Sequence, residues 1–466
     1  MNFNSPEFLL FFPLVLLSFW AVFKHERGRD VVLLLASYAF YMSWNWRYAG
    51  LIAFSTLIDF AIGRKLAASD KQSTRKALLL GSLTINLGLL ALFKYYNFFV
   101  DLARESFSLI GTEIEIPHHE LLLPVGISFY TFQTLSYTLD IYRRELKPEG
   151  NLLKFALFVS FFPQLVAGPI VRASTFLPQL HKRPRVDAER MRYGLWRIFR
   201  GLFKKVIIAD LLANFAIDGV FADPTAFSSW DVLLALYAYS FQIYNDFSGY
   251  SDVAIGAACM LGFDIPMNFN RPYLSRNVRE FWTRWHISLS SWLRDYLYIP
   301  LGGNHGTKSR VKFNLSMTML LGGLWHGAAL NFVFWGAYHG LLLIFARATD
   351  RRPTKASLGR IVRERLVCFH LVLFGWLLFR VTSWQNLVEF GQAVFAFEGG
   401  TSLHPFFFAV LGLAIACHCI SQRWVESIGE RVRALPVIIQ GGLYAGMILL
   451  FSAATIESPA FIYFQF

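Results

Sequence analysis

Long apolar runs alternate with short polar stretches along the whole chain. Most of the runs approach the length of about 20 residues that a helix needs to cross a membrane. The runs are 6–23, 31–46, 48–63, 77–100, 121–141, 206–222, 232–262, 313–346, 366–380, 404–421 and 436–455. Run 313–346 is long enough for two short helices. The pattern therefore predicts an all-α, polytopic membrane protein with about 11–12 transmembrane helices.

The connections between these runs alternate in charge. Basic connections are 24–30, 64–76, 143–147, 172–205, 271–312, 347–365 and 423–433, whereas 101–120, 223–231 and 381–403 are acidic or neutral. Lys and Arg are retained on the cytoplasmic side of a membrane, so placing every basic connection there gives one consistent threading with both termini extracytoplasmic. The first run has no basic residue before it, so we expect it to remain as a span and not to be cleaved as a signal peptide.

Three further segments do not fit simple spanning. Residues 152–170 are apolar but lie between basic connections, which favours a re-entrant segment broken at Pro163 and Pro169. Residues 193–205 form a basic amphipathic pattern, which predicts an interfacial helix on the cytoplasmic side. Residues 277–300 mix charged and aromatic side chains and are expected to line an enclosed or watery cavity. No internal repeat divides the chain, so one domain over 1–466 is the simplest expectation.

Composition agrees with a membrane protein and excludes other classes. Of 466 residues, 55% are hydrophobic and 16% charged, whereas soluble domains are roughly 25% charged. The net charge of +13 is typical of a membrane protein whose cytoplasmic loops are rich in Lys and Arg. Some of these residues are also candidates to bind an anionic cytosolic substrate. No nucleic-acid motif accompanies it, so nucleic acid is not an expected partner. The four cysteines lack metal-ligand spacing, which predicts packing residues and no metal site.

His326 is the sharpest candidate for chemistry, because it lies within the apolar run 313–346. An ionisable group at membrane depth costs about 2.5–3.5 kcal/mol and is a functional candidate by default. Gly322, Gly323 and Gly327 leave room around it for close backbone packing or for a substrate chain. A neutral imidazole there can take a proton from a hydroxyl that attacks an acyl carbonyl. The alternative is a histidine that hydrogen-bonds two helices.

His286 is the second candidate. If its segment is helical, His286 and Ser290 share a face, and Arg294 and Asp295 follow within two turns. The alternative is an interfacial aromatic helix with snorkelling arginines. His339 lies thirteen residues after His326 and is a weaker candidate.

A third constellation is crowded into run 232–262. Its polar members are Asn245, Asp246, Ser248, Ser251 and Asp252. So many polar groups in one span predict a cavity or a hydrogen-bonded network. The two aspartates either orient a histidine or hold a helix pair together, and we favour the second role.

Several segments together resemble one known family. They are Leu123–Gln133, Ala167–Arg172, Asp246–Asp252, Arg284–Asn304 and Gly322–Ala328. In these segments the chain is similar to the membrane-bound O-acyltransferase (MBOAT) family. It resembles the bacterial subgroup of the alginate O-acetyltransferase membrane subunit and the D-alanyl transfer protein of teichoic acid synthesis. The resemblance extends to the closing residues 461–466.

The resemblance implies a many-helix fold around a central funnel with a thin core. The catalytic histidine of the family falls on His326 and its second histidine on His286. The resemblance further implies a protein of the bacterial inner membrane that passes an acyl group outward to a separate extracytoplasmic partner, often of the SGNH-hydrolase type. Residues expected to line its cavity are Asn245, Asp246, Ser248, Trp325, Arg294 and Asp295. Asn245 stands where an aromatic residue is expected.

The leading hypothesis is an O-acetyltransferase subunit that uses cytoplasmic acetyl-CoA to acetylate an exported polysaccharide such as alginate. Acetyl-CoA is then a donor and not a permanently bound cofactor. The expected counter-charges for its phosphates are Arg276, Arg279 and Arg284, or the group Lys182, Arg183 and Arg185. One alternative is an acyl relay for peptidoglycan, cellulose or teichoic acid, the last with a D-alanyl carrier as donor. Another is a transporter of a lipid-linked sugar or an ion, which the absence of repeated halves disfavours.

Overall fold

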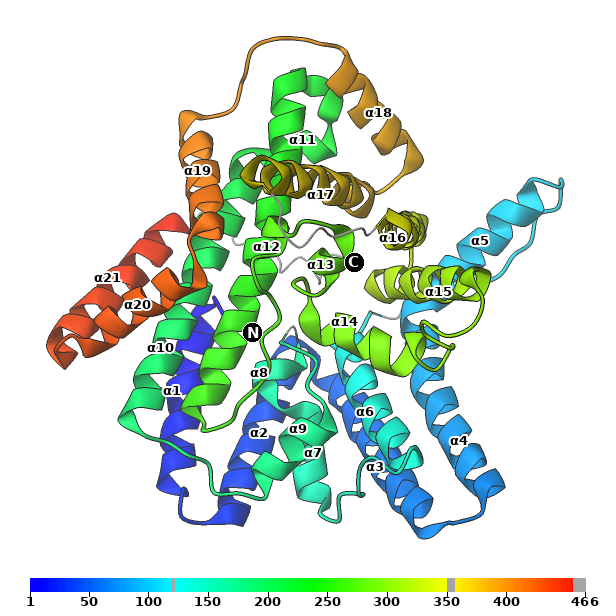
Figure 1. Ribbon diagram of the computed structural model, residues 1–466. Coiled ribbons are helices and arrows are strands. Elements are labelled where there is room, and N and C mark those ends of the chain that lie inside the picture. The colour runs from blue at the N-terminus through cyan, green and yellow to red at the C-terminus, as the bar shows by residue number, and fades with distance from the viewer. Residues whose placement is uncertain (120–121, 167, 350–356, 456–466) are drawn as a thin grey trace. The chain divides into compact units, whose positions relative to one another are not determined.

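The computed structural model describes residues 1–119, 122–166, 168–349 and 357–455. Within these ranges the chain forms helices and no β-strand (Figure 1), so the prediction of an all-α protein is confirmed. The closing segment 461–466 lies outside the described residues. The chain separates into two compact units, Met1–Asp187 with Ala257–Pro266, and Ala188–Gly256 with Met267–Phe466. A single domain over 1–466 stays a prediction, and each unit is described by itself.

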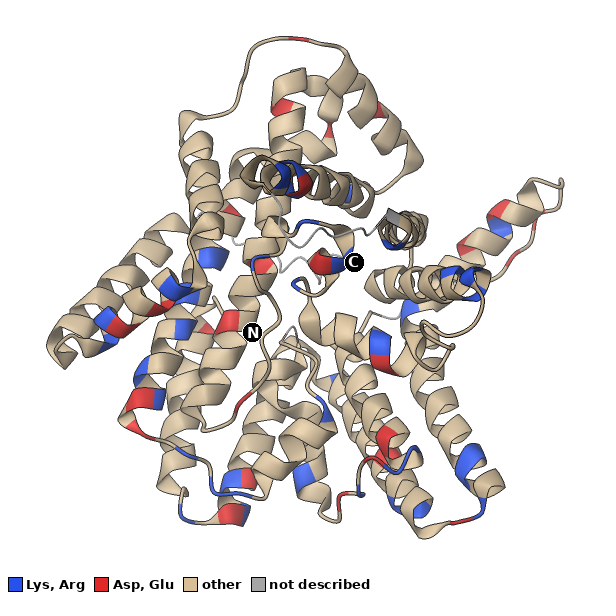
Figure 2. Cartoon of the chain, in the orientation of Figure 1, with Lys and Arg blue, Asp and Glu red and all other residues tan. Residues whose placement is uncertain are grey.

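The first unit holds the N-terminal helices. They are α1 (Pro6–Ala21), α2 (Glu26–Asn45), α3 (Ala49–Ala68), α4 (Gln72–Leu90), α5 (Tyr96–Ser108), α6 (Ile127–Tyr142), α7 (Leu152–Ser160), α8 (Phe162–Leu165) and α9 (Ala173–Leu180). The α1–α2, α3–α4 and α6–α7 connections lie at one end of this unit, where its Lys and Arg residues gather (Figure 2). These are the basic connections 24–30, 64–76 and 143–147, so the basic connections between the helices of this unit share one end.

A buried carboxylate ties three helices of the first unit together. Asp59 on α3 is fully buried. It accepts hydrogen bonds from Ser82 Oγ (2.6 Å) and Asn86 Nδ2 (2.9 Å) on α4, and from Thr138 Oγ1 (3.3 Å) on α6. Since a buried charge without partners is costly, these donors fix how α3, α4 and α6 pack.

The apolar segment 152–170 is broken, but two residues before the predicted Pro163. The break falls at Phe161, between α7 and α8, and Pro163 occupies the first turn of α8. A proline is tolerated in a first turn because the amide it removes has no helical partner there. Helix α8 ends at Leu165, before Pro169.

The second unit begins with a long segment that includes two π-helical stretches. It runs through α10 (Ala188–Leu202), the π-helical segments η3 (Phe203–Asp210) and η4 (Ala213–Ile217), and α11 (Asp218–Ala222). The later helices are α12 (Ser229–Met260), α13 (Val278–Trp282), α14 (Ile287–Leu293), η7 (Arg294–Tyr298), α15 (Lys308–His326), α16 (Leu330–Thr349), α17 (Leu358–Arg380), α18 (Trp384–Phe395), α19 (Pro405–Cys419), α20 (Gln422–Ala434) and α21 (Val437–Ala454). Helices α20 and α21 pack against α10, and α19 packs against η3.

Every predicted apolar run lies largely on helix, and run 313–346 forms two helices, α15 and α16, as expected. Among the described residues, three helical stretches are by themselves long and apolar enough to cross a membrane: Gln72–Ser108, Leu330–Ala348 and Val437–Ala454. Helices α19 and α20 would form a fourth span, although they are bent by 98° at their break. The other predicted spans are shorter or carry buried polar groups, as helices that pack against protein do.

Glycines allow α10 and α12 to pack backbone to backbone within the second unit. A Cβ atom at Gly201 would lie 2.5 Å from the carbonyl oxygen of Gly249, and one at Gly256 would lie 2.5 Å from that of Gly194. Such distances exclude any side chain at these positions. The close approach brings the basic side chains of α10 within reach of acidic residues on α12.

The α15–α16 hairpin also depends on a glycine that lets two helix backbones pack closely, and this leads to a first prediction. A Cβ atom at Gly323 would lie 2.2 Å from the carbonyl oxygen of Phe332. We therefore expect Gly323→Ala to destabilise the protein by about 1–3 kcal/mol, because overpacking forces the two backbones apart. The measurement is the thermal unfolding temperature of the purified protein.

A matched control is Gly391→Ala on α18, where nothing lies within 4 Å of the added carbon. Because alanine favours a helix over glycine by about 0.5–1 kcal/mol, this variant should be as stable as the parent or slightly more so. Equal stability of Gly323→Ala and Gly391→Ala would contradict the close packing of the hairpin.

Candidate active site

His286 lies at the start of α14 and is fully buried. Its backbone has φ +41° and ψ 56°, the left-handed conformation that non-glycine residues rarely adopt. Such a conformation costs about 1–3 kcal/mol and persists only where surrounding contacts hold it. The Phe247 ring packs edge-on against the imidazole at 4.7 Å between ring centres.

Asn268 fixes the orientation and the tautomer of His286. Its Oδ1 accepts hydrogen bonds from the backbone N–H (3.2 Å) and the hydroxyl (2.8 Å) of Ser288. An N–H can only donate, so this atom is the amide oxygen. His286 Nδ1 lies 3.2 Å from the same oxygen and must therefore carry the proton. Nε2 is then the basic nitrogen of His286.

His326 is the last residue of α15, where the chain leaves the helix at Gly327 with extended backbone angles. Three aromatic rings enclose its imidazole. Their centres lie 5.0 Å (Trp325), 5.0 Å (Trp335) and 5.2 Å (Phe379) from it, each in an edge-on arrangement. The rings come from α15, α16 and α17, so the site is assembled at the turn of the α15–α16 hairpin. Gly327 belongs to this packing, because a Cβ atom there would lie 2.0 Å from the Phe332 ring.

The two histidines lie on a common aromatic framework. Trp325 contacts His326 directly, and its ring centre lies 5.8 Å from that of His286. Both histidines are buried: His326 retains 5% exposure, whereas His286 has none.

His339 is a packing residue in this structure. It is fully buried between Trp335 (4.8 Å) and Trp282 (5.2 Å). A Cβ atom at Gly375 would lie 2.6 Å from its Nε2, so that glycine makes room for the ring.

The three arginines expected to bind coenzyme A differ in their surroundings. Arg276 pairs with Glu364 (2.6 Å) and Arg284 with Glu280 (2.7 Å). Arg279 is exposed. Carboxylates thus pair with Arg276 and Arg284.

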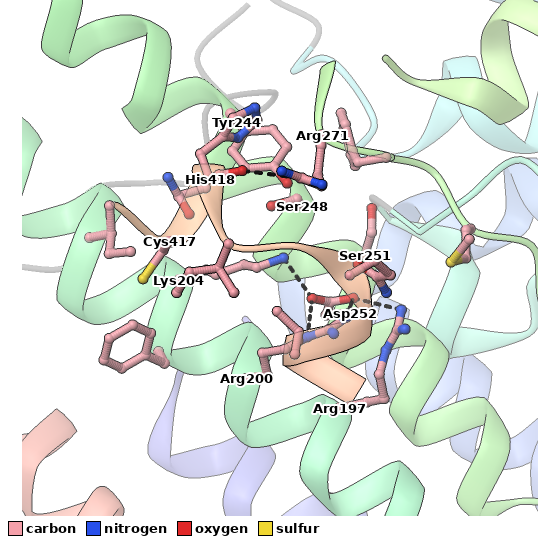
Figure 3. A pocket seen from close by; sticks show the side chains of 18 of the residues that line it. Arg197, Arg200, Lys204, Tyr244, Ser248, Ser251, Asp252, Arg271, Cys417 and His418 are labelled. Carbon is pink, nitrogen blue, oxygen red and sulfur yellow. Dashed lines mark hydrogen bonds and ion pairs between the residues drawn. The ribbon is translucent and has the colours of Figure 1, made fainter. Parts of the chain in front are cut away.

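A stronger concentration of cations lies where α10 meets α12. Asp252 accepts from Arg197 (2.6 Å), Arg200 (2.7 Å) and Lys204 (2.8 Å), and Figure 3 shows these three side chains around its carboxylate. The neighbouring Asp246 pairs with Lys205 at 2.8 Å. The favoured role of the two aspartates, holding a helix pair together, agrees with these contacts.

A cavity of about 420 Å³ opens beside this cluster. Of the residues predicted to line a cavity, Asn245 and Ser248 do so. Asp246, Trp325, Arg294 and Asp295 are not among the described residues that line it. Trp325 belongs to the histidine framework, while Arg294 and Asp295 pair with each other at 2.6 Å, with most of the Arg294 side chain exposed.

Sequence reasoning assigned the basic face of residues 193–205 to the cytoplasmic interface, whereas the structure buries most of it. Arg197, Arg200 and Lys204 recur at helical spacing on one face. Their side chains are 5%, 16% and 20% exposed. The signal that could have revealed this was Asp252 in an apolar run, since a buried carboxylate needs cationic partners.

Comparison with known proteins identifies the chain's relatives. The family model for the membrane-bound O-acyltransferase family matches residues 118–388. A Pseudomonas aeruginosa protein named "Probable alginate O-acetylase" is 42% identical over 85% of this chain and 75% of its own length. The peptidoglycan O-acetyltransferase of Helicobacter pylori is 35% identical over 86% of this chain and 81% of its own length. The teichoic acid D-alanyltransferase of Bacillus subtilis is 30% identical over 56% and 70%.

The family match includes the histidine framework of α13–α17 as well as the helices α6 to α12. With the apolar helices already described, it accounts for a multi-pass membrane enzyme that transfers acyl groups. The chain belongs to the membrane-bound O-acyltransferase family.

Proposed function

We propose that this protein is the membrane subunit of a polysaccharide O-acetyltransferase. It takes an acetyl group from cytoplasmic acetyl-CoA and passes it across the bacterial inner membrane to an exported polysaccharide, with alginate as the first candidate. The observation that carries the proposal is the position of His326, buried among three aromatic rings at the turn of the α15–α16 hairpin. Similarity over most of the chain to proteins named for alginate O-acetylation supports the choice of acceptor.

In this proposal His326 is the general base. Its imidazole takes the proton of an acceptor hydroxyl while that oxygen attacks the acetyl carbonyl. The new C–O bond forms, the C–S bond breaks, and the coenzyme A thiolate leaves and takes the proton back from the imidazolium. Positioned general-base catalysis accelerates such a step by about 10²–10⁴-fold.

The rings of Trp325, Trp335 and Phe379 give the base an apolar surrounding. Such walls keep water from competing with the acceptor hydroxyl for the thioester. They also suit a small uncharged acetyl group, while the polyanionic coenzyme A stays in the cytosol. Arg276, Arg279 and Arg284 are proposed to supply counter-charge for its phosphates, and exposed Arg279 is the most accessible of them.

The proposal includes an extracytoplasmic partner of the SGNH-hydrolase type, which places the acetyl group on the polysaccharide. It also places both termini outside the cytoplasm. Support for this orientation is the collection of basic connections at one end of the first unit (Figure 2), since such connections remain in the cytoplasm.

The similarity to teichoic acid D-alanyltransferases favours a second candidate donor, a D-alanyl carrier protein thioester.

The two candidate donors, acetyl-CoA and this thioester, predict different results in vesicles that contain the protein. With labelled acetyl-CoA on the side of the basic connections and the partner and alginate on the other, we expect label on alginate. A D-alanyl carrier protein thioester should give no transfer.

Oligomannuronate and peptidoglycan fragments are the matched acceptors for this experiment. Transfer to peptidoglycan alone would redirect the proposal to the function named for the Helicobacter relative. Consumption of the D-alanyl thioester in place of acetyl-CoA would overturn the choice of donor.

A further inference from the structure

The cavity beside Asp252 lies wholly within the second unit and is built from several helices. Its walls come from α10 and η3, from α12, from residues 267–271 and from α19 and α20 (Figure 3). Neither His286 nor His326 is among the described residues that line it.

The lining of the cavity carries an excess of positive charge. The charged residues that line it are Arg197, Arg200, Lys204, Arg271 and Asp252. Three of the cations share the single carboxylate of Asp252. The Arg271 hydrogen bonds run to the backbone carbonyls of His418 (3.3 Å) and Cys419 (2.7 Å), which carry no net charge. Three positive charges in excess at a partly buried site attract an anion.

Two buried polar atoms belong to residues that line the cavity. Ser251 Oγ and His418 Nδ1 have no hydrogen-bond partner among the described residues, and their residues are 2% and 5% exposed. His418 Nε2 accepts from the backbone N–H of Tyr273 at 3.2 Å. The proton of a neutral His418 is therefore on Nδ1, which becomes a donor. A hydroxyl and an imidazole N–H suit the oxygens of a phosphate.

The cavity also has apolar walls. Its aliphatic and aromatic walls include Phe203, Ile208, Ile255, Met267, Val425 and Ile428. A ligand that fills the whole cavity must therefore combine an anionic group with a hydrocarbon chain.

Helix α20 indicates where such a ligand enters. It is bent by 98° from α19, and its apolar residues Trp424 and Ile428 are 63% and 43% exposed. Its last turn carries Arg431 and Arg433. A helix with exposed apolar side chains and basic ends lies in the headgroup region of a membrane. Ile428 lines the cavity as well, so the cavity opens beside a helix suited to contact lipid.

We propose that this cavity binds an anionic phospholipid, such as phosphatidylglycerol or cardiolipin. Its phosphate contacts Arg271 and Lys204 with Ser251 and His418, and an acyl chain leaves past Val425 and Ile428. Basic pockets between membrane helices bind such headgroups. Asn268, which contacts His286, is one of the residues that line this cavity. The test of the lipid site does not depend on enzyme activity.

The test uses the full-length protein purified in detergent and returned to defined lipid. Native mass spectrometry measures which phospholipids stay bound, and thermal unfolding measures the stabilisation by added phosphatidylglycerol or phosphatidylcholine. We expect the parent protein to retain phosphatidylglycerol in preference to phosphatidylcholine. Arg271→Gln should reduce this retention by about tenfold, because a charge-assisted contact to the phosphate is lost.

Two further variants make the test decisive. Val425→Trp fills the apolar part of the cavity without removing a charge and should reduce retention similarly, even if Arg271→Gln fails to fold. Arg310→Gln is the matched control, because Arg310 also donates to a backbone carbonyl, that of Leu301, but lies on the exposed start of α15. It should retain phosphatidylglycerol like the parent.

Equal retention of phosphatidylglycerol and phosphatidylcholine would overturn the proposal. So would an equal loss in Arg310→Gln. Displacement of the bound lipid by acetyl-CoA at the same cavity would assign it to the donor nucleotide and would also overturn the lipid assignment.

Discussion

Replacement of His326 by alanine should abolish acetyl transfer and leave the protein folded in the membrane. The imidazole is the proposed base, and without it the acceptor hydroxyl has no group to take its proton. We expect the rate to fall by about 10²–10⁴-fold. The measurement is the labelled acetyl group that appears on the polysaccharide in vesicles containing the protein and its partner.

His326→Gln and His370→Gln sharpen this prediction. Glutamine retains much of the volume between the surrounding rings but is not a base at neutral pH, so His326→Gln should be equally inactive. His370 is exposed on α17, where it contacts Tyr237, and its replacement should leave transfer unchanged. Normal transfer by either His326 variant, in protein that unfolds at the parent temperature, would end the catalytic assignment.

Replacement of Asp252 by alanine should give the largest loss of stability. Its carboxylate is buried and compensates Arg197, Arg200 and Lys204. Without it, these cations remain close together with no common anion. Breaking a buried ion pair by removing one partner costs about 3–5 kcal/mol. Thermal or denaturant unfolding of the purified variant would measure the loss.

Asp70→Ala is the matched control for Asp252→Ala. Asp70 also pairs with an arginine, Arg144, at 3.1 Å, but the two side chains are 94% and 65% exposed. Exposed pairs contribute about 0–1 kcal/mol, so this variant should unfold close to the parent. A similar small effect of both substitutions would show that Asp252 does not hold α10 and α12 together.

The helices of this protein are well predicted by its hydrophobic pattern. Long apolar runs determine where helices form, and the division of run 313–346 into α15 and α16 follows from its length. Fewer helices are long and apolar enough to cross a membrane than there are apolar runs in the sequence. The hydrophobic pattern does not distinguish a helix that faces lipid from one that is buried among other helices. A buried polar residue such as Asp59 shows that its helix packs against other helices, but only once its hydrogen-bond partners are known.

The site shows the same limit. The sequence singled out His326 and His286 because ionisable groups in apolar surroundings are rare. It could not indicate that His286 adopts a left-handed backbone, because this depends on Asn268, eighteen residues earlier. Likewise, the spacing of Arg197, Arg200 and Lys204 predicts a basic face, but only the contact with α12 decides whether that face meets water or a carboxylate.

The shared carboxylate of Asp252 also constrains the order of assembly during synthesis. The segment of α10 and η3 leaves the ribosome before α12, so Arg197, Arg200 and Lys204 are made before their common anion. Like charges on successive turns destabilise an isolated helix and cannot enter hydrocarbon alone. The nascent segment must therefore wait at the aqueous surface of the membrane until α12 has been inserted, and only then can the two helices close upon each other.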